Sequence, residues 1–159
     1  VREAVFSSLG GMFDGGTVLD LYAGSGANGL EALSRGYDYA VFADISKDAI
    51  QVIRKNIESL RCKEKTKVLH MPDKKALSLL KAEGLRFDLI YLDPPYAGQR
   101  NNEILEYLQE NNMITDCGVV VIESAKEDEF KKEFGSLKPY KEATYGITRI
   151  TYYRNEVEG

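Results

Sequence analysis

Residues 17–29, TVLDLYAGSGANG, decide the fold of this chain of 159 residues. An apolar run over residues 17–22 predicts a buried strand, and the strand leads directly into a turn containing Gly24, Gly26 and Gly29. These glycines match the spacing G-x-G-x-x-G, which lets the backbone turn tightly into a helix and lets a ligand contact the backbone. The stretch therefore predicts an α/β fold with a ligand site at the carboxyl end of its first strand.

The rest of the chain alternates between strand and helix patterns. Strands are expected over residues 39–43, 67–70, 87–92 and 118–123. Helices are expected over residues 28–34, 47–60, 74–82, 101–110 and 127–133, and a further amphipathic helix is under way at Val1. Strands that alternate with helices pair in parallel through right-handed crossovers.

The end of the chain has a different pattern. Residues 140–145 and 148–154 are rich in Thr, Ile and Tyr and flank Gly146, which predicts a hairpin of two strands. The whole chain, residues 1–159, is therefore expected to be one domain. Its architecture is expected to be a doubly wound, mostly parallel seven-stranded sheet with a C-terminal antiparallel hairpin.

Composition excludes several kinds of site. Cys62, Cys117 and the single His70 have no metal-ligand spacing, so no metal is expected, and the thiols are expected to be reduced in a cytoplasmic protein. No apolar run approaches the roughly 18 residues of a membrane span. The net charge of -4 argues against holding nucleic acid by bulk electrostatics alone. Because the chain begins at Val1 rather than Met, residues before it are expected to be missing.

The acids around the glycine loop discriminate between two ligands, a dinucleotide and S-adenosylmethionine. Asp20, just before the loop, would repel a pyrophosphate but suits a ligand that carries an ammonium and a sulfonium. Asp44 ends the second predicted strand, about 20 residues after the glycines, where an acid accepts hydrogen bonds from ribose hydroxyls. Asp73 follows the third strand and suits either the adenine amino group or the cap of the next helix. The pattern favours S-adenosylmethionine.

A second motif lies at the end of the fourth predicted strand. Residues 87–96 read FDLIYLDPPY, so an apolar run stops at Asp93, two prolines and Tyr96. Alone, this pattern is equally typical of an ordinary turn. Beside a methyl donor it predicts a clamp for a planar NH2 group, in which Asp93 and the Pro94 carbonyl accept the two N–H bonds and Tyr96 stacks on the ring.

The chain resembles the class I S-adenosylmethionine-dependent methyltransferases, whose fold is Rossmann-like. More narrowly, it is similar to the bacterial family that methylates N2 of a guanine in small-subunit (16S) ribosomal RNA. The stretches that carry the resemblance are VREAVF at 1–6, VLDLYAGSG at 18–26, GLEALSRG at 29–36, LDPPY at 92–96, Glu123-Ser124 and Tyr145-Gly146.

The resemblance implies roles for named residues and for partners. It implies that S-adenosylmethionine is the cofactor, with S-adenosylhomocysteine as product, and that the partner is ribosomal RNA, within an assembling small subunit. It also implies a monomer that needs neither a metal nor a membrane. The implied cofactor contacts are Asp20, Gly24, Gly26, Asp44 and Asp73, and the implied catalytic residues are Asp93, Pro94 and Tyr96.

Three departures from the family pattern are visible. Asp44 stands where such proteins often have Glu, and Lys74 stands where a small residue is common. The family's segment before Val1, which is expected to help hold RNA, is missing, so this chain is expected to bind cofactor well and substrate poorly. Three alternatives stay open: a DNA methyltransferase acting on adenine N6 or cytosine N4, a protein-glutamine methyltransferase, and a degenerate module that only binds the cofactor.

Overall fold

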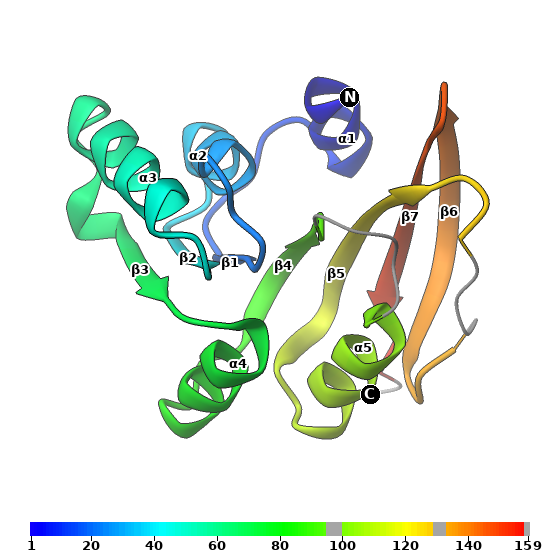
Figure 1. Ribbon diagram of the computed structural model, residues 1–159. Helices are drawn as coiled ribbons and strands as arrows, with labels where there is room; N and C mark the ends of the chain where they lie inside the picture. The colour runs from blue at the N-terminus through cyan, green and yellow to red at the C-terminus, as the bar shows by residue number, and fades with distance from the viewer. Residues whose placement is uncertain (95–99, 129–132, 158–159) are drawn as a thin grey trace.

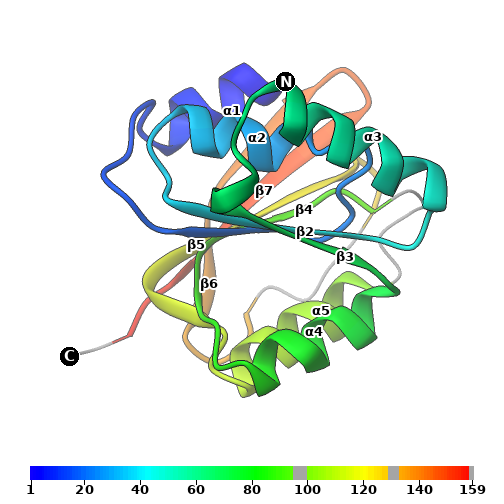
Figure 2. The same cartoon turned by 90° about the vertical axis from the view of Figure 1, so that its left-hand side faces the viewer.

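The computed structural model describes residues 1–94, 100–128 and 133–157, and the structural statements below refer to these residues. A seven-stranded sheet lies between two layers of helices, with α1, α2 and α3 on one face and α4 and α5 on the other (Figures 1 and 2). The strands are β1 (Thr17–Asp20), β2 (Tyr39–Asp44), β3 (Thr66–His70), β4 (Phe87–Leu92), β5 (Ile114–Ala125), β6 (Leu137–Tyr145) and β7 (Thr148–Asn155). The α-helices are α1 (Arg2–Leu9), α2 (Ala27–Ser34), α3 (Lys47–Ser59), α4 (Asp73–Ala82) and α5 (Asn101–Glu110), and a short 3-10 helix spans Lys63–Lys65.

The strand order is β3-β2-β1-β4-β5-β7-β6. The first five strands of this order pair in parallel, and β7 pairs antiparallel with both β5 and β6. The predicted doubly wound sheet with its terminal hairpin is therefore confirmed. Because the chain leaves β1 toward β2 on one side and reaches β4 on the other, the order reverses between β1 and β4, where such sheets bind ligands.

Apolar side chains on both faces of the sheet hold the helices in place. On one face Leu77 of α4 and Leu105 of α5 are buried with strand residues. On the other face Phe6 of α1 and Ile53 of α3 are buried in an apolar cluster that also contains Phe42 of β2. The alternating pattern predicted both layers because each helix needs only one apolar stripe to cover its face of the sheet.

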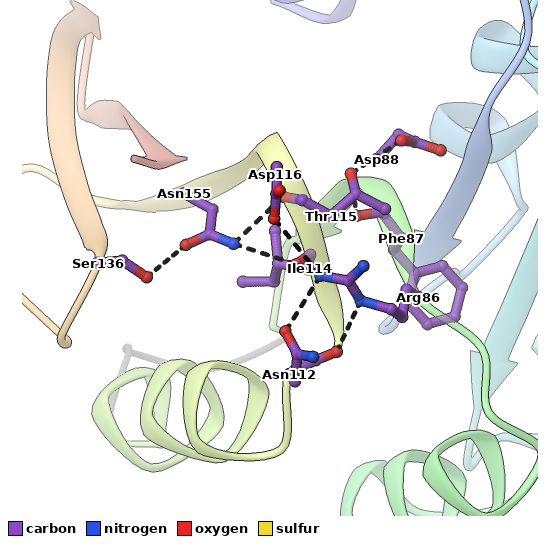
Figure 3. Close-up of polar contacts among 9 residues, drawn as sticks. All are labelled: Arg86, Phe87, Asp88, Asn112, Ile114, Thr115, Asp116, Ser136 and Asn155. Carbon is purple, nitrogen blue, oxygen red and sulfur yellow. Dashed lines mark hydrogen bonds and ion pairs between the residues drawn. The ribbon is translucent and has the colours of Figure 1, made fainter. Parts of the chain in front are cut away.

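The fifth strand is longer than predicted, because it begins with a bulge that carries no apolar pattern. Two steps along β4, from Phe87 to Leu89, stand opposite five steps along β5, from Ile114 to Val119. Figure 3 shows the polar network at this bulge. Arg86 donates hydrogen bonds to the Asn112 side chain and to the carbonyls of Asn112 and Ile114. The network lies at the amino end of β4, away from the ligand edge of the sheet.

Two further predictions need comment. β6 begins at Leu137, before the predicted start of that strand, and its register against β7 shifts between Pro139 and Lys141. Pro139 has no N–H to donate, and an edge strand tolerates this because one of its sides makes no hydrogen bonds to another strand. The helix expected over residues 127–133 falls largely on residues outside the described ones. In the described part of the chain, no helix has both the length and the apolar character needed to cross a membrane.

Candidate active site

A cavity of about 870 Å³ opens at the carboxyl edge of the parallel strands. The segments that follow successive strands form its wall, as expected where parallel strands end at one edge of a sheet. Its principal lining residues are Tyr22, Ala23, Gly24 and Ser25 after β1, Asp44, Ile45 and Ser46 at the end of β2, Met71, Pro72 and Asp73 after β3, Asp93 after β4, Glu123 of β5, Arg2 of α1 and Arg100 just before α5.

Asp44 joins the glycine loop to the end of β2. Its Oδ2 accepts a hydrogen bond from the backbone N–H of Gly24 at 2.9 Å, and its Oδ1 accepts one from Ser46 at 2.9 Å. Gly24 has a φ of +56°, and no atom lies within 4 Å of where a Cβ would stand. The loop backbone is therefore open on that side, and both predicted residues line the cavity.

Asp20 lies behind the cavity wall and holds the loop from the protein side. Its side chain is 1% exposed, and its Oδ2 accepts the N–H of Gly29 at 3.0 Å. Its Oδ1 has no hydrogen-bond partner among the described residues. The pKa of Asp20 is raised to about 7: burial has the largest effect, the charges of Asp93, Asp44 and Glu123 add to it, and the Gly29 N–H partly opposes it. Neither Asp20 nor Gly26, predicted as cofactor contacts, is among the described residues that line the cavity.

Asp73 is fixed by three donors at the end of β3. Its carboxylate accepts hydrogen bonds from the Tyr22 hydroxyl at 2.7 Å, the Lys74 N–H at 2.7 Å and Arg100 at 3.1 Å. Burial alone would raise its pKa, but these hydrogen bonds and the Arg100 charge lower the pKa of Asp73 below its usual range. Asp73 is the first residue of α4 and Pro72 is the cap, so the capping alternative is not what the structure has.

Lys74, the unusual residue next to Asp73, does not compete for this carboxylate through its side chain. Its ammonium group is exposed and pairs with Glu103 at 3.3 Å. Asp73 therefore lines the cavity as a charged group, and it accepts side-chain hydrogen bonds from Tyr22 and Arg100.

The second motif ends β4 at the same cavity. Asp93 lines it and Pro94 follows half-buried, whereas Tyr96 lies outside the described residues. The pKa of Asp93 is raised to about 7, first by partial desolvation of its carboxyl group at the cavity wall and then by the charge of the neighbouring Glu123. Glu123 also accepts a hydrogen bond from the Tyr91 hydroxyl at 2.8 Å.

Sequence reasoning assigned no role in the site to Tyr22, Arg100 or Glu123. The available signal for Glu123 was positional, because an acid at the carboxyl end of a strand next to β4 reaches the same edge as Asp93. Arg100 immediately precedes α5, and no periodicity in the sequence indicates its contact with Asp73. Tyr22 lies within the predicted first strand, but its hydroxyl contact depends on Asp73, 51 residues later.

The cavity is suited to a cationic organic ligand. The acids Asp44, Asp73, Asp93 and Glu123 line it and Asp20 lies behind them, against the two arginines Arg2 and Arg100. Asp20 and Asp93, whose pKa values are raised, are stabilised in their ionised form by a positive charge placed beside them. Over residues 1–94, 100–128 and 133–157, no group of three or more His, Cys, Asp or Glu side chains is arranged to hold a metal ion.

Comparison with known proteins gives a match over almost the whole chain. The family model described as "Conserved hypothetical protein 95" matches residues 1–154. The Bacillus subtilis protein named "Putative rRNA methyltransferase YlbH" is 36% identical over 154 residues, which are 97% of this chain and 84% of that protein. The Escherichia coli protein named "Ribosomal RNA small subunit methyltransferase D" is 28% identical over 159 residues, covering all of this chain and 78% of that protein.

A solved structure agrees with the fold. A Streptococcus pyogenes protein described only as a conserved hypothetical protein superposes with a TM-score of 0.91 and 38% identity, covering 98% of this chain and 96% of its own. The strand order and the helical layers therefore recur over nearly the full length of that protein.

Proposed function

The chain belongs to the Conserved hypothetical protein 95 family, and on that premise we propose that it transfers a methyl group from S-adenosylmethionine to the exocyclic N2 amine of a guanine in small-subunit ribosomal RNA. The observation that carries the proposal is that residues of both sequence motifs line one cavity. Gly24 and Asp44 stand at one part of its wall, and Asp93, which Pro94 follows in the chain, stands at another. The names of the relatives from Bacillus subtilis and Escherichia coli support ribosomal RNA as the substrate class.

The carboxylates at the cavity fit S-adenosylmethionine as hydrogen-bond acceptors. Asp44 would accept hydrogen bonds from its ribose hydroxyls and Asp73 from its adenine amino group. Asp20, whose buried Oδ1 has no hydrogen-bond partner in the part of the chain that the structure describes, would stabilise its ammonium group electrostatically from behind the glycine loop. When bound, this cofactor supplies a methyl group on a positively charged sulfur, and that sulfur keeps the electron pair of the broken S–CH3 bond.

The residues at the end of β4 would prepare the amine. The nitrogen of a guanine NH2 is a poor nucleophile because its lone pair is delocalised into the ring. Asp93 and the Pro94 carbonyl accept its two N–H bonds, which favours a pyramidal nitrogen with its lone pair directed at the methyl group. A base within a helix must first leave its stack, at a cost of a few kcal/mol.

Labelled methyl transfer tests the proposal directly. The protein is incubated with methyl-labelled S-adenosylmethionine and with small ribosomal subunits from a strain that lacks this methylation, and the nucleosides are then separated. N2-methylguanosine is the expected product. Label in adenine or cytosine, or label in duplex DNA supplied in parallel, would contradict the assigned substrate. A protein that binds the cofactor and transfers nothing to either substrate would be a degenerate module.

A further inference from the structure

We propose that Glu123 is a positioning residue for the methyl-transfer step: held by Tyr91, its carboxylate lies beside the Asp93 carboxyl group, sets the position of that group against the acceptor amine and makes it a better acceptor for the proton that the amine releases. The inference rests on the proposed function, since the acceptor amine is part of that function. It gives a role to a side chain that the two sequence motifs do not include.

The sheet itself brings the two carboxyl groups together. β4 and β5 are parallel neighbours, and Leu92 stands opposite Ile122, so the next residues along, Asp93 and Glu123, lie side by side where β4 ends. Both line the cavity. A negative charge on Glu123 beside Asp93 favours the protonated form of Asp93 and so makes its carboxylate a better base.

Tyr91 fixes Glu123 from the protein side. It is fully buried, its ring stacks on Phe6 with centroids 6.3 Å apart, and its hydroxyl donates to Glu123 Oε1 at 2.8 Å. Burial, the charge of Glu123 and their hydrogen bond raise the pKa of Tyr91, so the hydroxyl stays a donor throughout the working pH range. A rigid core tyrosine therefore holds the Glu123 carboxylate at the place where Asp93 follows β4.

The charges around the pair come from every neighbouring segment. Tyr91 lies on β4, Asp20 ends β1, Asp44 ends β2, and Arg2 of α1 and Arg100 just before α5 line the same cavity. On β7 the residue opposite Glu123 is Ile150, which does not titrate. Desolvation raises the pKa of Asp93 most, and the charge of Glu123 raises it further.

The pair gives the released proton a destination. Once the amine nitrogen has formed its bond to the methyl carbon, it carries a positive charge and an excess proton. One N–H bond then breaks, its electron pair stays on nitrogen, and the proton adds to the Asp93 carboxylate. Asp93 then returns this proton to solvent, so its carboxylate is ready for the next transfer.

Two measurements test this role, with Glu123→Gln as the variant and Glu142→Gln as the matched control on the exposed face of β6. The first is the pH profile of single-turnover methyl transfer to unmethylated small subunits. The wild type should lose rate below about pH 7, where Asp93 becomes protonated. Glu123→Gln should move this limb to lower pH and lose about 10- to 100-fold in rate at pH 8, because Asp93 is no longer held. Glu142→Gln should match the wild type.

The second measurement is independent of substrate. Carboxyl NMR of the cofactor-free protein follows the titration of Asp93, whose pKa should fall in Glu123→Gln and rise in Tyr91→Phe, because the latter removes a donor that stabilises the ionised pair. An Asp93 titration that is the same in all three proteins would overturn the inference even if the enzyme is active. If the wild type transfers no methyl group to RNA, the proposed function fails, while the titration still decides whether Glu123 controls Asp93.

Discussion

The carboxylate of Asp44 accepts the backbone N–H of Gly24 at 2.9 Å, which ties the end of β2 to the glycine loop after β1. Its other oxygen accepts the N–H of Ser46, just before α3. One side chain thus sets the relative position of two segments that line the cavity. This arrangement gives Asp44 two effects on a bound ligand, direct hydrogen bonds and the shape of the loop.

Asp44→Ala should weaken the binding of S-adenosylmethionine by about 1–3 kcal/mol, the usual loss when hydrogen bonds to a charged group are removed. Titration calorimetry measures the change in dissociation constant. Asp48→Ala, in the exposed first turn of α3, is the matched control and should bind like the wild type. An unchanged dissociation constant in Asp44→Ala would remove Asp44 from the cofactor site.

Asp93→Ala should abolish methyl transfer and leave the dissociation constant of the cofactor nearly unchanged. The physical reason is that Asp93 faces the acceptor amine, so its loss removes an interaction needed in the transition state rather than one that holds the cofactor. Single-turnover transfer and calorimetry on the same preparation separate the two effects. Transfer at the wild-type rate would refute the role assigned to Asp93.

The sequence predicted the sheet and the two motifs because both depend on local patterns. An apolar run followed by Gly24, or by Asp93 and Pro94, can be read without knowing the rest of the fold. The parallel order then follows from the alternation of strands and helices. Asp44, Asp73 and Asp93 line the cavity for this reason.

What the sequence could not predict depends on contacts between distant segments. Glu123 meets Tyr91 across 32 residues, and its partner is set by the register of β4 against β5. Asp20 was expected to contact the ligand directly. In the structure its side chain is buried behind the loop, where it accepts the N–H of Gly29. The bulge before Val119 has no apolar pattern that would predict it, and the side-chain network around Arg86 that holds it joins residues far apart in the sequence.

Arg86→Ala should destabilise the fold and leave the site intact. Arg86 donates to two carbonyls and one side-chain oxygen at the bulge that begins β5 (Figure 3). Because the side chain is partly exposed, the expected loss in the free energy of unfolding is about 1–3 kcal/mol. Urea unfolding measures the loss, and cofactor affinity below the transition should be unchanged. A change in affinity without a change in stability would contradict this view of the network.

Gly29→Ala should destabilise the packing of α2 on the sheet. A Cβ at Gly29 would overlap the ring of Phe42 on β2, so either the ring or the helix must move. Overpacking of this kind typically costs about 1–3 kcal/mol. Thermal or urea unfolding checks the value, and Phe42→Leu in the same chain should make Gly29→Ala less costly. A double variant whose effects simply add would show that the ring is not the obstacle.

Asp20 should make stability depend on pH. Its pKa is raised from 3.8 to about 7 in the folded protein, so folding favours the neutral acid. Above pH 4 the unfolded chain ionises Asp20 freely and the folded chain does not, and the free energy of unfolding therefore falls as pH rises toward 7. The shift corresponds to at most about 4 kcal/mol.

Asp20→Asn isolates this contribution from that of Asp93, which titrates in the same range. Urea unfolding at pH 5, 6.5 and 8 should show a smaller loss of stability in Asp20→Asn than in the wild type. Asp116→Asn, on the exposed bulge of β5, should keep the wild-type slope. Saturating S-adenosylmethionine should stabilise the wild type more at pH 8 than at pH 5, because its positive charge favours the ionised acid. Equal slopes in the wild type and Asp20→Asn would show that Asp20 ionises in the folded protein as it does in the unfolded chain.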